Sequence, residues 1–526
     1  MKLSFYLHKN GAKYAMLTSI GGCISILGYL IYILNPLQLI LDKLLTFQPG
    51  SLIFKLWTQP PYEVLAKIYI FNVTNSEQFL AGKEKLNLTQ TGPYVYQEIV
   101  HNSEAIFNEN GTLTYKPIRE LKFRPELSVE DPDKARIIGP NIPLLGISSY
   151  MKNEYGLFMN LGFSSVVNMV KSPSLTNLSV TEYLFGYEDP LVELASTYVP
   201  SWIDFTKFGI LDRLMSIDNG NTITMHLSTN TTSKDDILYQ YSVDIFNGSP
   251  GLKQWGYRED IPEENSPCNT VEGAFESGVF PRHLKENTTV RLYRKAFCRS
   301  TSMIYENTDY TSSGMKYYNY RIDQNFLSTS EENPENKCFC KNSKKCLPKG
   351  FGSLDPCYYG IPIAMSQPHY LNADPEIRKQ VIGMNPDQEK HDTVMKLSPE
   401  LGIPIYARLR MQINLNVSPD QIVTSSKPFQ GMILPLFWVE LGIYDMPSYL
   451  GILINIAAQI PTIEMVTSYI LGMIGALMIA TVGVCVIRGF NQNRSDVESE
   501  NQGLESSPFL SIPVQPIIRS EFKLLR

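Results

Sequence analysis

The chain has 526 residues, of which 43% are hydrophobic and 19% are charged, and its net charge is -6. That hydrophobic fraction can fill a large core and excludes general disorder. The mildly acidic balance lacks the basic excess with which proteins bind DNA or RNA, so no nucleic-acid partner is expected.

The first predicted element is an uncharged segment near the N-terminus, Ala15 to Leu34. Twenty helical residues rise about 30 Å, which is the thickness of the hydrocarbon core of a bilayer. A cleaved signal peptide is the alternative, but its apolar core covers about 7–15 residues before a small-residue cleavage site. Here the apolar stretch is longer and NPLQLILDK follows it. The segment therefore predicts a transmembrane helix over 14–36, preceded by a tail over 1–13.

Between the two ends of the chain, strands are expected to outnumber helices. Runs of β-branched and aromatic residues stand between turn residues, and such runs are typical of strands. They are KIYIFNV, GPYVYQEIV, ILYQYSVDIF, TVRLYR and KYYNYRI. The sequence therefore predicts an α+β, mainly antiparallel β domain over 37–463.

A helical insertion is predicted within about 147–200. Apolar residues recur at spacings of three and four from Ile147 to Val170. Leu157, Leu161 and Met169 add apolar surface away from that stripe, so this helix carries more apolar surface than one packed face needs. Neighbouring helices that bury both sides are the alternative. A second helix is predicted to begin at SVTE, where Ser179 and Glu182 have the spacing of a capping box.

Six of the eight cysteines lie between Cys268 and Cys357, a disulfide-rich region over 268–357. A zinc site would need two Cys-x-x-Cys or Cys/His pairs, and a redox site would need one Cys-x-x-Cys. The close pair here is Cys338-x-Cys340, so three structural disulfides are favoured over metal or redox chemistry. Six cysteines allow fifteen pairings, and spacing does not choose among them.

Two strands are predicted near the end of this domain. In ARLRMQINLNV, Leu409 to Val417 alternate with polar residues, so one buried face and one solvent-exposed face that carries Arg408 to Asn416 are expected. MILPLFWVEL is apolar on both faces and is expected to be a central or tunnel-lining strand.

The second transmembrane helix is predicted over 464–487, where Met465 to Ile487 contain no charge. Lys and Arg flank the outer ends of both spans, which places both tails, including 488–526, in the cytoplasm. The loop between the spans would then be lumenal or extracellular. Asn-x-Ser/Thr sequons in it are candidate glycosylation sites: Asn72, Asn87, Asn110, Asn177, Asn230, Asn247, Asn287 and Asn416.

Catalytic motifs are missing from the sequence. There is no Gly-x-Ser-x-Gly elbow, no His-Glu-x-x-His and no phosphate-binding glycine loop, so no enzyme, no catalytic residue and no metal ligand is expected. The histidines are scattered, and none lies between His101 and His226, so no histidine switch is available in the helical insertion. In the C-terminal tail, Glu505, Phe509 and Leu510 resemble an acidic dileucine sorting signal.

Eight stretches stand in a set order between the two spans: IFNVTN, GPYVYQE, FGYEDPL, FNGSPGLKQWGY, CNTVEGAFESGVFPRHL, FCRSTSMIYE, SQPHYLNADPEI and ILPLFWVE. In this order and spacing, together with the terminal spans, they resemble the class B scavenger receptor family, which includes the fatty acid translocase and the lysosomal integral membrane protein. The family implies a barrel-like ectodomain with a lipid tunnel and an apical helical bundle. It also implies the disulfides Cys268–Cys338, Cys298–Cys357 and Cys340–Cys346.

The resemblance implies a membrane receptor that binds lipids or lipoproteins and passes a fatty acid or sterol through the tunnel to the membrane. No cofactor is expected, and the ligand would be a fatty acid, sterol or phospholipid. Implied partners are membrane lipids, lipoproteins, apoptotic or lipid particles, a protein ligand at the bundle and a second copy of the chain. Leu157, Leu161, Met169 and Lys171 are the candidate ligand contacts; a solvated loop lysine is the alternative for Lys171.

The implied location is the plasma membrane, with endosomal or lysosomal residence also open. The alternative function is an endo-lysosomal membrane glycoprotein that acts as a protein-sorting or docking receptor.

Overall fold

The computed structural model describes residues 2–218, 220–227, 236–276, 278–312, 314–340, 346–419, 421–444 and 447–504. The chain forms two compact units. One is the central unit, Leu44–Ala458, and the other is the terminal unit, which contains residues 1–43 and 459–526.

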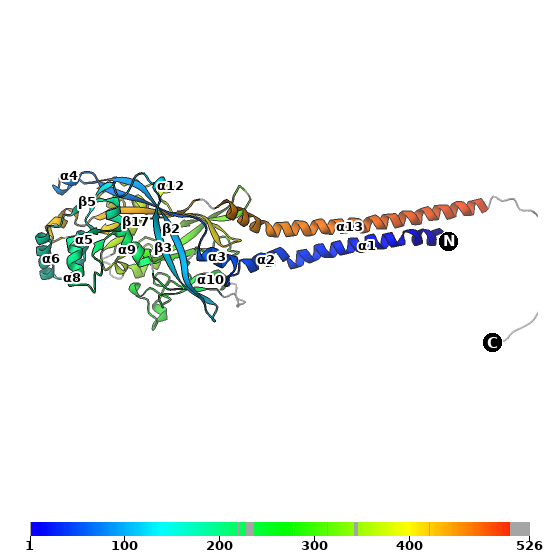
Figure 1. Ribbon diagram of the computed structural model, residues 1–526, viewed down its shortest axis with the longest axis horizontal. Helices are drawn as coiled ribbons and strands as arrows, with labels where there is room; N and C mark the ends of the chain where they lie inside the picture. The colour runs from blue at the N-terminus through cyan, green and yellow to red at the C-terminus, as the bar shows by residue number, and fades with distance from the viewer. Residues whose placement is uncertain are drawn as a thin grey trace, which may run out of the picture. The chain divides into compact units, whose positions relative to one another are not determined.

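A large sheet organises the central unit (Figure 1). Its main path of hydrogen-bonded neighbours is β10-β11-β12-β16-β17-β18-β1-β2-β3-β8-β9, with β13 and β14 joined through β17 and β15 through β2. The pairs are antiparallel apart from β15 with β2. The strands of this sheet are β1 (Val64–Val73), β2 (Leu86–Phe107), β3 (Thr112–Phe123), β8 (Ile223–His226), β9 (Val243–Phe246), β10 (Val290–Arg294), β11 (Arg299–Tyr310), β12 (Lys316–Ile322), β13 (Phe351–Ser353), β14 (Ile363–Ser366), β15 (Val381–Ile382), β16 (Val394–Ser398), β17 (Ile403–Asn416) and β18 (Ile433–Ile443).

Two short pairs stand apart from the large sheet, and helices fill the connections. The pairs are β4 (Arg136–Pro140) with β5 (Leu175–Ser179) and β6 (Tyr187–Glu188) with β7 (Lys207–Phe208). The helices of the central unit are α3 (Leu52–Thr58), α4 (Ser76–Leu80), α5 (Ile142–Glu154), α6 (Leu157–Val170), α7 (Val180–Phe185), α8 (Pro190–Tyr198), α9 (Ile210–Asp218), α10 (Asp236–Tyr239), α11 (Pro375–Arg378) and α12 (Gln388–His391).

The two outer strands of the main path are joined by a short irregular segment. Val243 of β9 bridges Ala274, and the next residue, Phe275, bridges Leu292 of β10. The backbone bonds are short, with Val243 N to Ala274 O at 2.7 Å and Phe275 N to Arg291 O at 2.8 Å. The strands at the two ends of the main path, β9 and β10, are therefore joined through the adjacent residues Ala274 and Phe275.

The predicted central strand is confirmed. β18 lies between β17 and β1, and Leu434, Leu436 and Phe437 are fully buried. Strands that have a covered face on each side read as continuous apolar runs, which explains the absence of alternation in this segment.

The predicted solvent-exposed face of β17 is wrong. Arg410 is 4% exposed, and Gln412 and Asn414 are fully buried. The reason is the segment from Gln367 to Asp392, which covers this face: the His369 N–H donates to Gln412 Oε1 at 2.7 Å. Buried polar groups are stable when they are hydrogen-bonded, so an alternating strand can be covered on both faces.

The predicted strand ILYQYSVDIF is wrong in its first half, where α10 ends at Tyr239 before β9 begins at Val243. The predicted helix near Ile147 is two helices, α5 and α6. Asn160 ends α5, because its side-chain amide donates to the carbonyl groups of Met151, Tyr155 and Gly156 at 2.9–3.1 Å. The capping box at Ser179 and Glu182 is confirmed as the start of α7. α5, α6 and α8 contact one another and lie together at one end of the unit (Figure 1).

The terminal unit contains α1 (Lys2–Leu34), most of α2 (Pro36–Leu44) and most of α13 (Ser448–Leu504). Residues 11–44 and 451–492 are long and apolar enough to cross a membrane, and the predicted spans 14–36 and 464–487 fall within them.

Glu464 is buried, and its carboxylate accepts bonds from the backbone N–H groups of Leu37 and Gln38. A carboxylate at a helix N-terminus is a stabilising arrangement, because it satisfies donors that have no partner within the helix.

α1 and α13 run side by side (Figure 1) and touch through glycines. A Cβ atom added at Gly28 would lie 2.8 Å from the Ser468 carbonyl oxygen, and one at Gly21 would lie 3.0 Å from that of Gly475. Small residues allow helices in membranes to approach this closely.

Gly28→Leu is expected to separate α1 from α13, because the new side chain has no space against Ser468. Gly22→Leu is the matched control, because a Cβ atom there meets nothing within 4 Å. The measurement is disulfide cross-linking between cysteines placed at Gly21 and Met478, because a Cβ atom added at Gly21 would lie 3.1 Å from the Cβ atom of Met478. Equal cross-linking in both variants would contradict the glycine contact.

Candidate functional site

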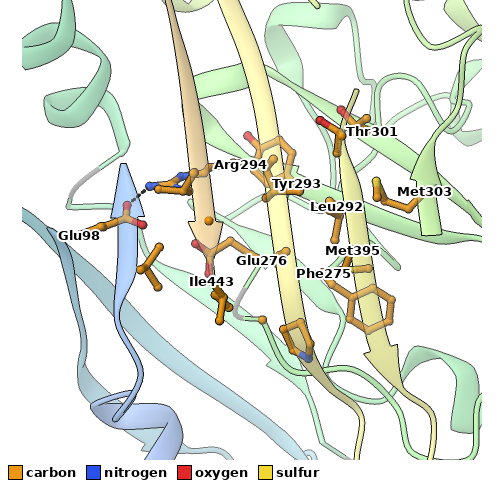
Figure 2. A pocket seen from close by; sticks show the side chains of 18 of the residues that line it. Glu98, Phe275, Glu276, Leu292, Tyr293, Arg294, Thr301, Met303, Met395 and Ile443 are labelled. Carbon is orange, nitrogen blue, oxygen red and sulfur yellow. Dashed lines mark hydrogen bonds and ion pairs between the residues drawn. The ribbon is translucent and has the colours of Figure 1, made fainter. Parts of the chain in front are cut away.

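The central unit contains a cavity of about 200 Å³ that is lined mainly by apolar side chains. β10, β11, β16, β17 and β18 contribute to it (Figure 2), and among its apolar residues are Phe275, Leu292, Met303, Met395, Leu409 and Leu441. Leu409 and Met411 of β17 reach it because alternate side chains of a strand point to the same side. Cavities that bind small molecules are lined in this way, with a few polar groups that fix the orientation of the ligand.

Four charged residues at the cavity form an ion-pair chain: Arg294, Glu98, Arg119 and Glu276. Arg294 contacts Glu98, Arg119 Nε lies 3.7 Å from Glu98 Oε1, and Arg119 contacts Glu276. The Tyr115 hydroxyl donates to Glu276 Oε2 at 2.9 Å. In Figure 2, Glu98 and Arg294 lie on one side of the cavity, and Leu292, Met303 and Met395 lie toward the other side.

The ion-pair chain is almost removed from water. The side chains of Glu98, Arg119 and Glu276 are 4–7% exposed, and that of Arg294 is 19% exposed. Two arginines and two glutamates balance one another in charge, which is what allows charged groups to be buried. Burial first, and the charge of Glu98 second, raise the pKa of the Tyr62 phenol at the same cavity to about 12.

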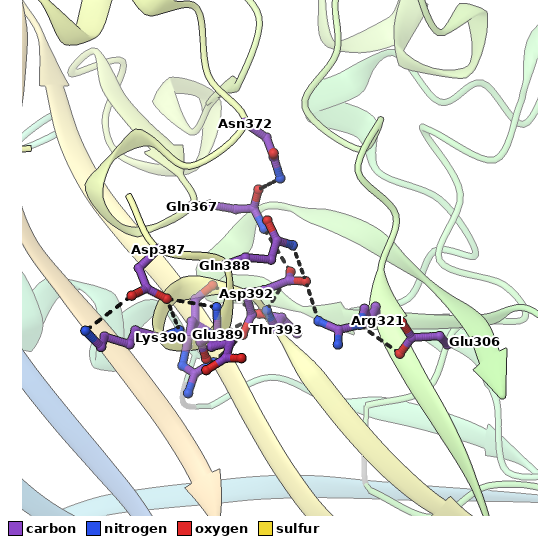
Figure 3. A network of polar contacts seen from close by, with 11 residues as sticks. Glu306, Arg321, Gln367, Asn372, Asp387, Gln388, Glu389, Lys390, Asp392 and Thr393 are labelled. Atoms are coloured by element: carbon purple, nitrogen blue, oxygen red, sulfur yellow. Dashed lines mark hydrogen bonds and ion pairs between the residues drawn. The ribbon is translucent and has the colours of Figure 1, made fainter. Parts of the chain in front are cut away.

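A second polar network fixes the segment that covers β17 (Figure 3). Asp392 accepts bonds from Arg321 at 3.0 Å, from Gln367 at 3.2 Å and from Gln388 at 2.8 Å. Arg410 of β17 donates from its guanidinium to the backbone carbonyl of Glu389 at 3.2 Å. These contacts tie the covering segment to β12 and β17.

Two histidines that are separated in the sequence come together in the structure. His369 and His391 are stacked within the covering segment, with ring centroids 4.5 Å apart, and both are 6% exposed. Burial is the main cause that lowers the pKa of each to about 4. For His391, the charge of His369 is the second cause that lowers the pKa.

The candidate ligand contacts lie on α6 and just after it, far along the chain from most cavity residues. Leu157 is 61%, Leu161 48% and Met169 79% exposed. Phe158, which the periodicity places on the packed stripe, is 89% exposed. Lys171 is exposed and ends α6 in a left-handed conformation. The structure thus brings the three apolar residues together on one exposed helix but not with the cavity.

The cysteines form three disulfides in the pairs that the family resemblance implies: Cys268–Cys338, Cys298–Cys357 and Cys340–Cys346. Among the sequons, Asn110, Asn177, Asn247 and Asn287 are exposed, whereas Asn72, Asn87 and Asn416 are half-buried in strands. Asn230 and the sorting-signal residues Glu505, Phe509 and Leu510 lie outside the described residues.

The sequence reasoning missed the ion-pair chain. Its members come from β2, β3, β10 and the segment that bridges β9 to β10, so no local spacing connects them. The one available signal was that Glu98 and Arg119 are charged residues at inward positions of strands whose other inward residues are mainly apolar or aromatic, with Asn102 of β2 as a polar exception.

Known proteins resemble this chain along most of its length. A model of the CD36 family matches residues 19–486. Scavenger receptor class B member 1 of Bos taurus is 28% identical over 433 residues, which cover 81% of this chain and 80% of that protein. Lysosome membrane protein 2 of Homo sapiens is 26% identical over 442 residues, with coverage of 82% and 87%, and sensory neuron membrane protein 1 of Manduca sexta is 26% identical over 463 residues, with 85% of each. Because the family model spans most of the sequence, the chain belongs to the CD36 family.

Proposed function

We propose that this protein is a membrane-anchored receptor that binds a lipid in the cavity of its central unit and passes it toward the membrane. The observation that carries the proposal is the apolar cavity, lined largely by strands of one large sheet. Exposing a lipid chain to water costs about 0.8 kcal/mol for each methylene, so an apolar cavity is a favourable place for it. The names of the relatives, which describe receptors and membrane proteins, support the same reading.

The bridge from β9 through Ala274 and Phe275 to β10 supports a barrel-like arrangement of the sheet. In such an arrangement the cavity becomes part of a tunnel, and its apolar lining gives a lipid chain a route that excludes water. Both terminal helices would then anchor the receptor, with both tails in the cytoplasm and the central unit on the lumenal or extracellular side. Fatty acids, sterols and phospholipids, free or within lipoproteins, are the ligand classes that fit this role.

Leu292→Trp is expected to reduce the amount of lipid that copurifies with the full chain by more than half, because the larger ring fills the cavity that Leu292 lines. Ile304→Trp, on the neighbouring strand β11, is the control, because Ile304 is 41% exposed. The measurement is mass spectrometry of lipids extracted from protein purified in nanodiscs, normalised to protein. Unchanged lipid in Leu292→Trp, in protein that folds as well as the control, would exclude lipid binding in this cavity.

A docking role for α6 is the second candidate, and the exposed apolar side chains of this helix favour it. The exposed fraction of four apolar side chains on this helix is between 48% and 89%: Leu157, Phe158, Leu161 and Met169. Exposed apolar surface of this kind commonly marks a binding face. The occupant in this role would be a protein ligand or the surface of a lipid particle. Glu182, Glu188 and Glu193 stand nearby in the chain, which disfavours strongly anionic particles.

Leu161→Glu is expected to lower the capture of particles or protein partners about tenfold, because it adds a charge to an exposed apolar face. The protein should still mature, because Leu161 is not a core position. Ser165→Glu on the exposed side of the same helix is the control for added charge. Cell-surface amount and lipoprotein uptake are measured together. Normal uptake by mature Leu161→Glu would remove the docking role from α6.

A further inference from the structure

We propose that the ion-pair chain of Glu98, Arg119, Glu276 and Arg294 makes the cavity selective for lipids whose polar head is neutral, such as an alcohol or ester, over lipids with a free carboxylate. The inference rests on the proposed function, because it concerns the lipid head within the same cavity. It gives these four charged residues a role in lipid selection. Binding of an apolar lipid chain by the apolar lining does not by itself explain why charged residues stand at the cavity.

The charges at the cavity are already matched. Arg294 pairs with Glu98, Arg119 contacts both glutamates, and the further arginine of the lining, Arg410, donates to Glu440 at 2.6 Å. A carboxylate that enters this region meets two anionic side chains and guanidinium groups that already have carboxylate partners. It loses its hydration without gaining a cation of its own, which is unfavourable for a buried charge.

A hydroxyl group has no such difficulty. It can donate to a lone pair of a glutamate carboxylate, which has about four acceptor positions, and accept from a guanidinium, which has five N–H donors. Neither bond requires an existing ion pair to break. The apolar body of the ligand then lies against Leu292, Met303 and Met395, on the other side of the cavity from Glu98 and Arg294 (Figure 2).

The position of Arg294 favours this use. Its side chain is 19% exposed, whereas those of Glu98, Arg119 and Glu276 are 4–7% exposed. The chain of charges thus runs from a partly accessible guanidinium at the cavity to a carboxylate held by the Tyr115 hydroxyl at 2.9 Å. A ligand head that reaches the cavity can meet Arg294 and Glu98 together.

The experiment uses the full chain in phosphatidylcholine nanodiscs at neutral pH. Three photoreactive probes share one long alkyl chain and end in a hydroxyl, a carboxylate or an ammonium group. Labelling of peptides that contain Leu292 and Met303 is followed against probe concentration. The native protein is expected to be half-labelled at a hydroxyl-probe concentration about tenfold below that of the carboxylate probe.

Two variants shift the charge in opposite directions. Glu98→Gln leaves an excess positive charge, so labelling by the carboxylate probe should strengthen about tenfold while that by the hydroxyl probe changes less than about twofold. Arg294→Gln leaves an excess negative charge and should strengthen labelling by the ammonium probe instead. Each variant is expected to strengthen labelling by one probe only, whereas misfolding would change labelling by all three probes, since they share one alkyl chain. Glu126→Gln breaks an exposed pair with Arg124 and is expected to behave like the native protein.

The outcomes separate the inference from the function on which it rests. Cavity labelling that is equal for the hydroxyl and carboxylate probes, or ratios that neither variant changes, would overturn head-group selection but leave lipid binding intact. Absence of cavity labelling by all three probes would overturn both.

Discussion

Removing the disulfide between Cys298 and Cys357 is expected to lower the free energy of unfolding by about 4 kcal/mol, whereas removing the one between Cys340 and Cys346 is expected to lower it by about 2 kcal/mol. The difference follows from the chain that each bond closes. The two cysteines of the first pair are 59 residues apart, and those of the second pair are 6 apart. A longer closed loop removes more conformational freedom from the unfolded chain.

The position of Cys298 in the core increases the loss of stability that is expected when the Cys298–Cys357 disulfide is removed. Cys298 is fully buried in the main apolar core, so its replacement also disturbs packing. Total stabilities are typically about 5–15 kcal/mol, and a loss of about 4 kcal/mol is enough to cause retention during folding.

The measurement is chemical denaturation of two double variants, Cys298→Ala with Cys357→Ala and Cys340→Ala with Cys346→Ala, followed by Trp fluorescence. Pairwise replacement avoids a free thiol that could form new bonds. Glycan maturation in cells gives a second readout, which should fail for the first variant and persist for the second. Equal losses for both variants would contradict the loop-length argument.

Acidification is expected to destabilise the covering segment of β17 through His369 and His391. Both rings are held in a neutral tautomer by backbone donors: Nδ1 of His369 accepts from Asn385 N–H at 3.1 Å, and Nδ1 of His391 accepts from Asp387 N–H at 2.9 Å. A proton on either Nδ1 would place two donors face to face. The Nε2–H of His369 has its own acceptor, Gln90 Oε1, at 2.7 Å.

The direction of the effect follows from the two pKa values. Each is about 4 in the folded protein and 6.5 ordinarily, so the unfolded chain binds more protons between these values. Stability from the neutral rings is therefore fully present above pH 6.5 and is lost as the pH falls toward 4. At pH 5 the loss is about 2 kcal/mol for each histidine. Arg410 and Lys390 also disfavour a charge on His391, whereas Asp387 favours it.

The test compares the pH dependence of thermal unfolding between the native protein and His391→Gln. The variant should lose less stability than the native protein between pH 7 and pH 5, whatever its stability at pH 7. His101→Gln, at an exposed position of β2, is the control and should keep the native slope. A native slope in His391→Gln would show that acid sensitivity resides in other groups.

Local patterns predicted the elements that local chemistry determines. The predictions of the capping box at Ser179 and Glu182 and of the buried strand β18 were correct. A helix cap requires particular residues at a fixed spacing, and a strand covered on both faces requires a continuous apolar run, so both can be recognised in the sequence. The prediction for β17 failed because polar residues such as Gln412 and Asn414 show only that partners are needed. They do not show whether water or protein provides them.

The candidate site was harder to predict than the fold. Glu98 and Arg294 are 196 residues apart in the chain, and only the order of strands in the sheet brings them together. The pair of His369 and His391 likewise depends on how one irregular segment folds over β17. By contrast, the exposure of Leu157, Leu161 and Met169 could be predicted, because a surplus of apolar surface on one helix is a property of its own sequence, whereas Phe158 was expected on the packed side and is exposed.

The two-residue link through Ala274 and Phe275 also protects the protein from misassembly. An outer strand with open backbone groups can pair with the same strand of another molecule and start aggregation. Here Val243 of β9 and Leu292 of β10 already have a partner at this link. The partners of the link are close in the chain, since β9 ends at Phe246 and β10 begins at Val290. The backbone groups of both outer strands can therefore be paired at this point by one short stretch of chain, and another molecule cannot use them for pairing while the link is closed.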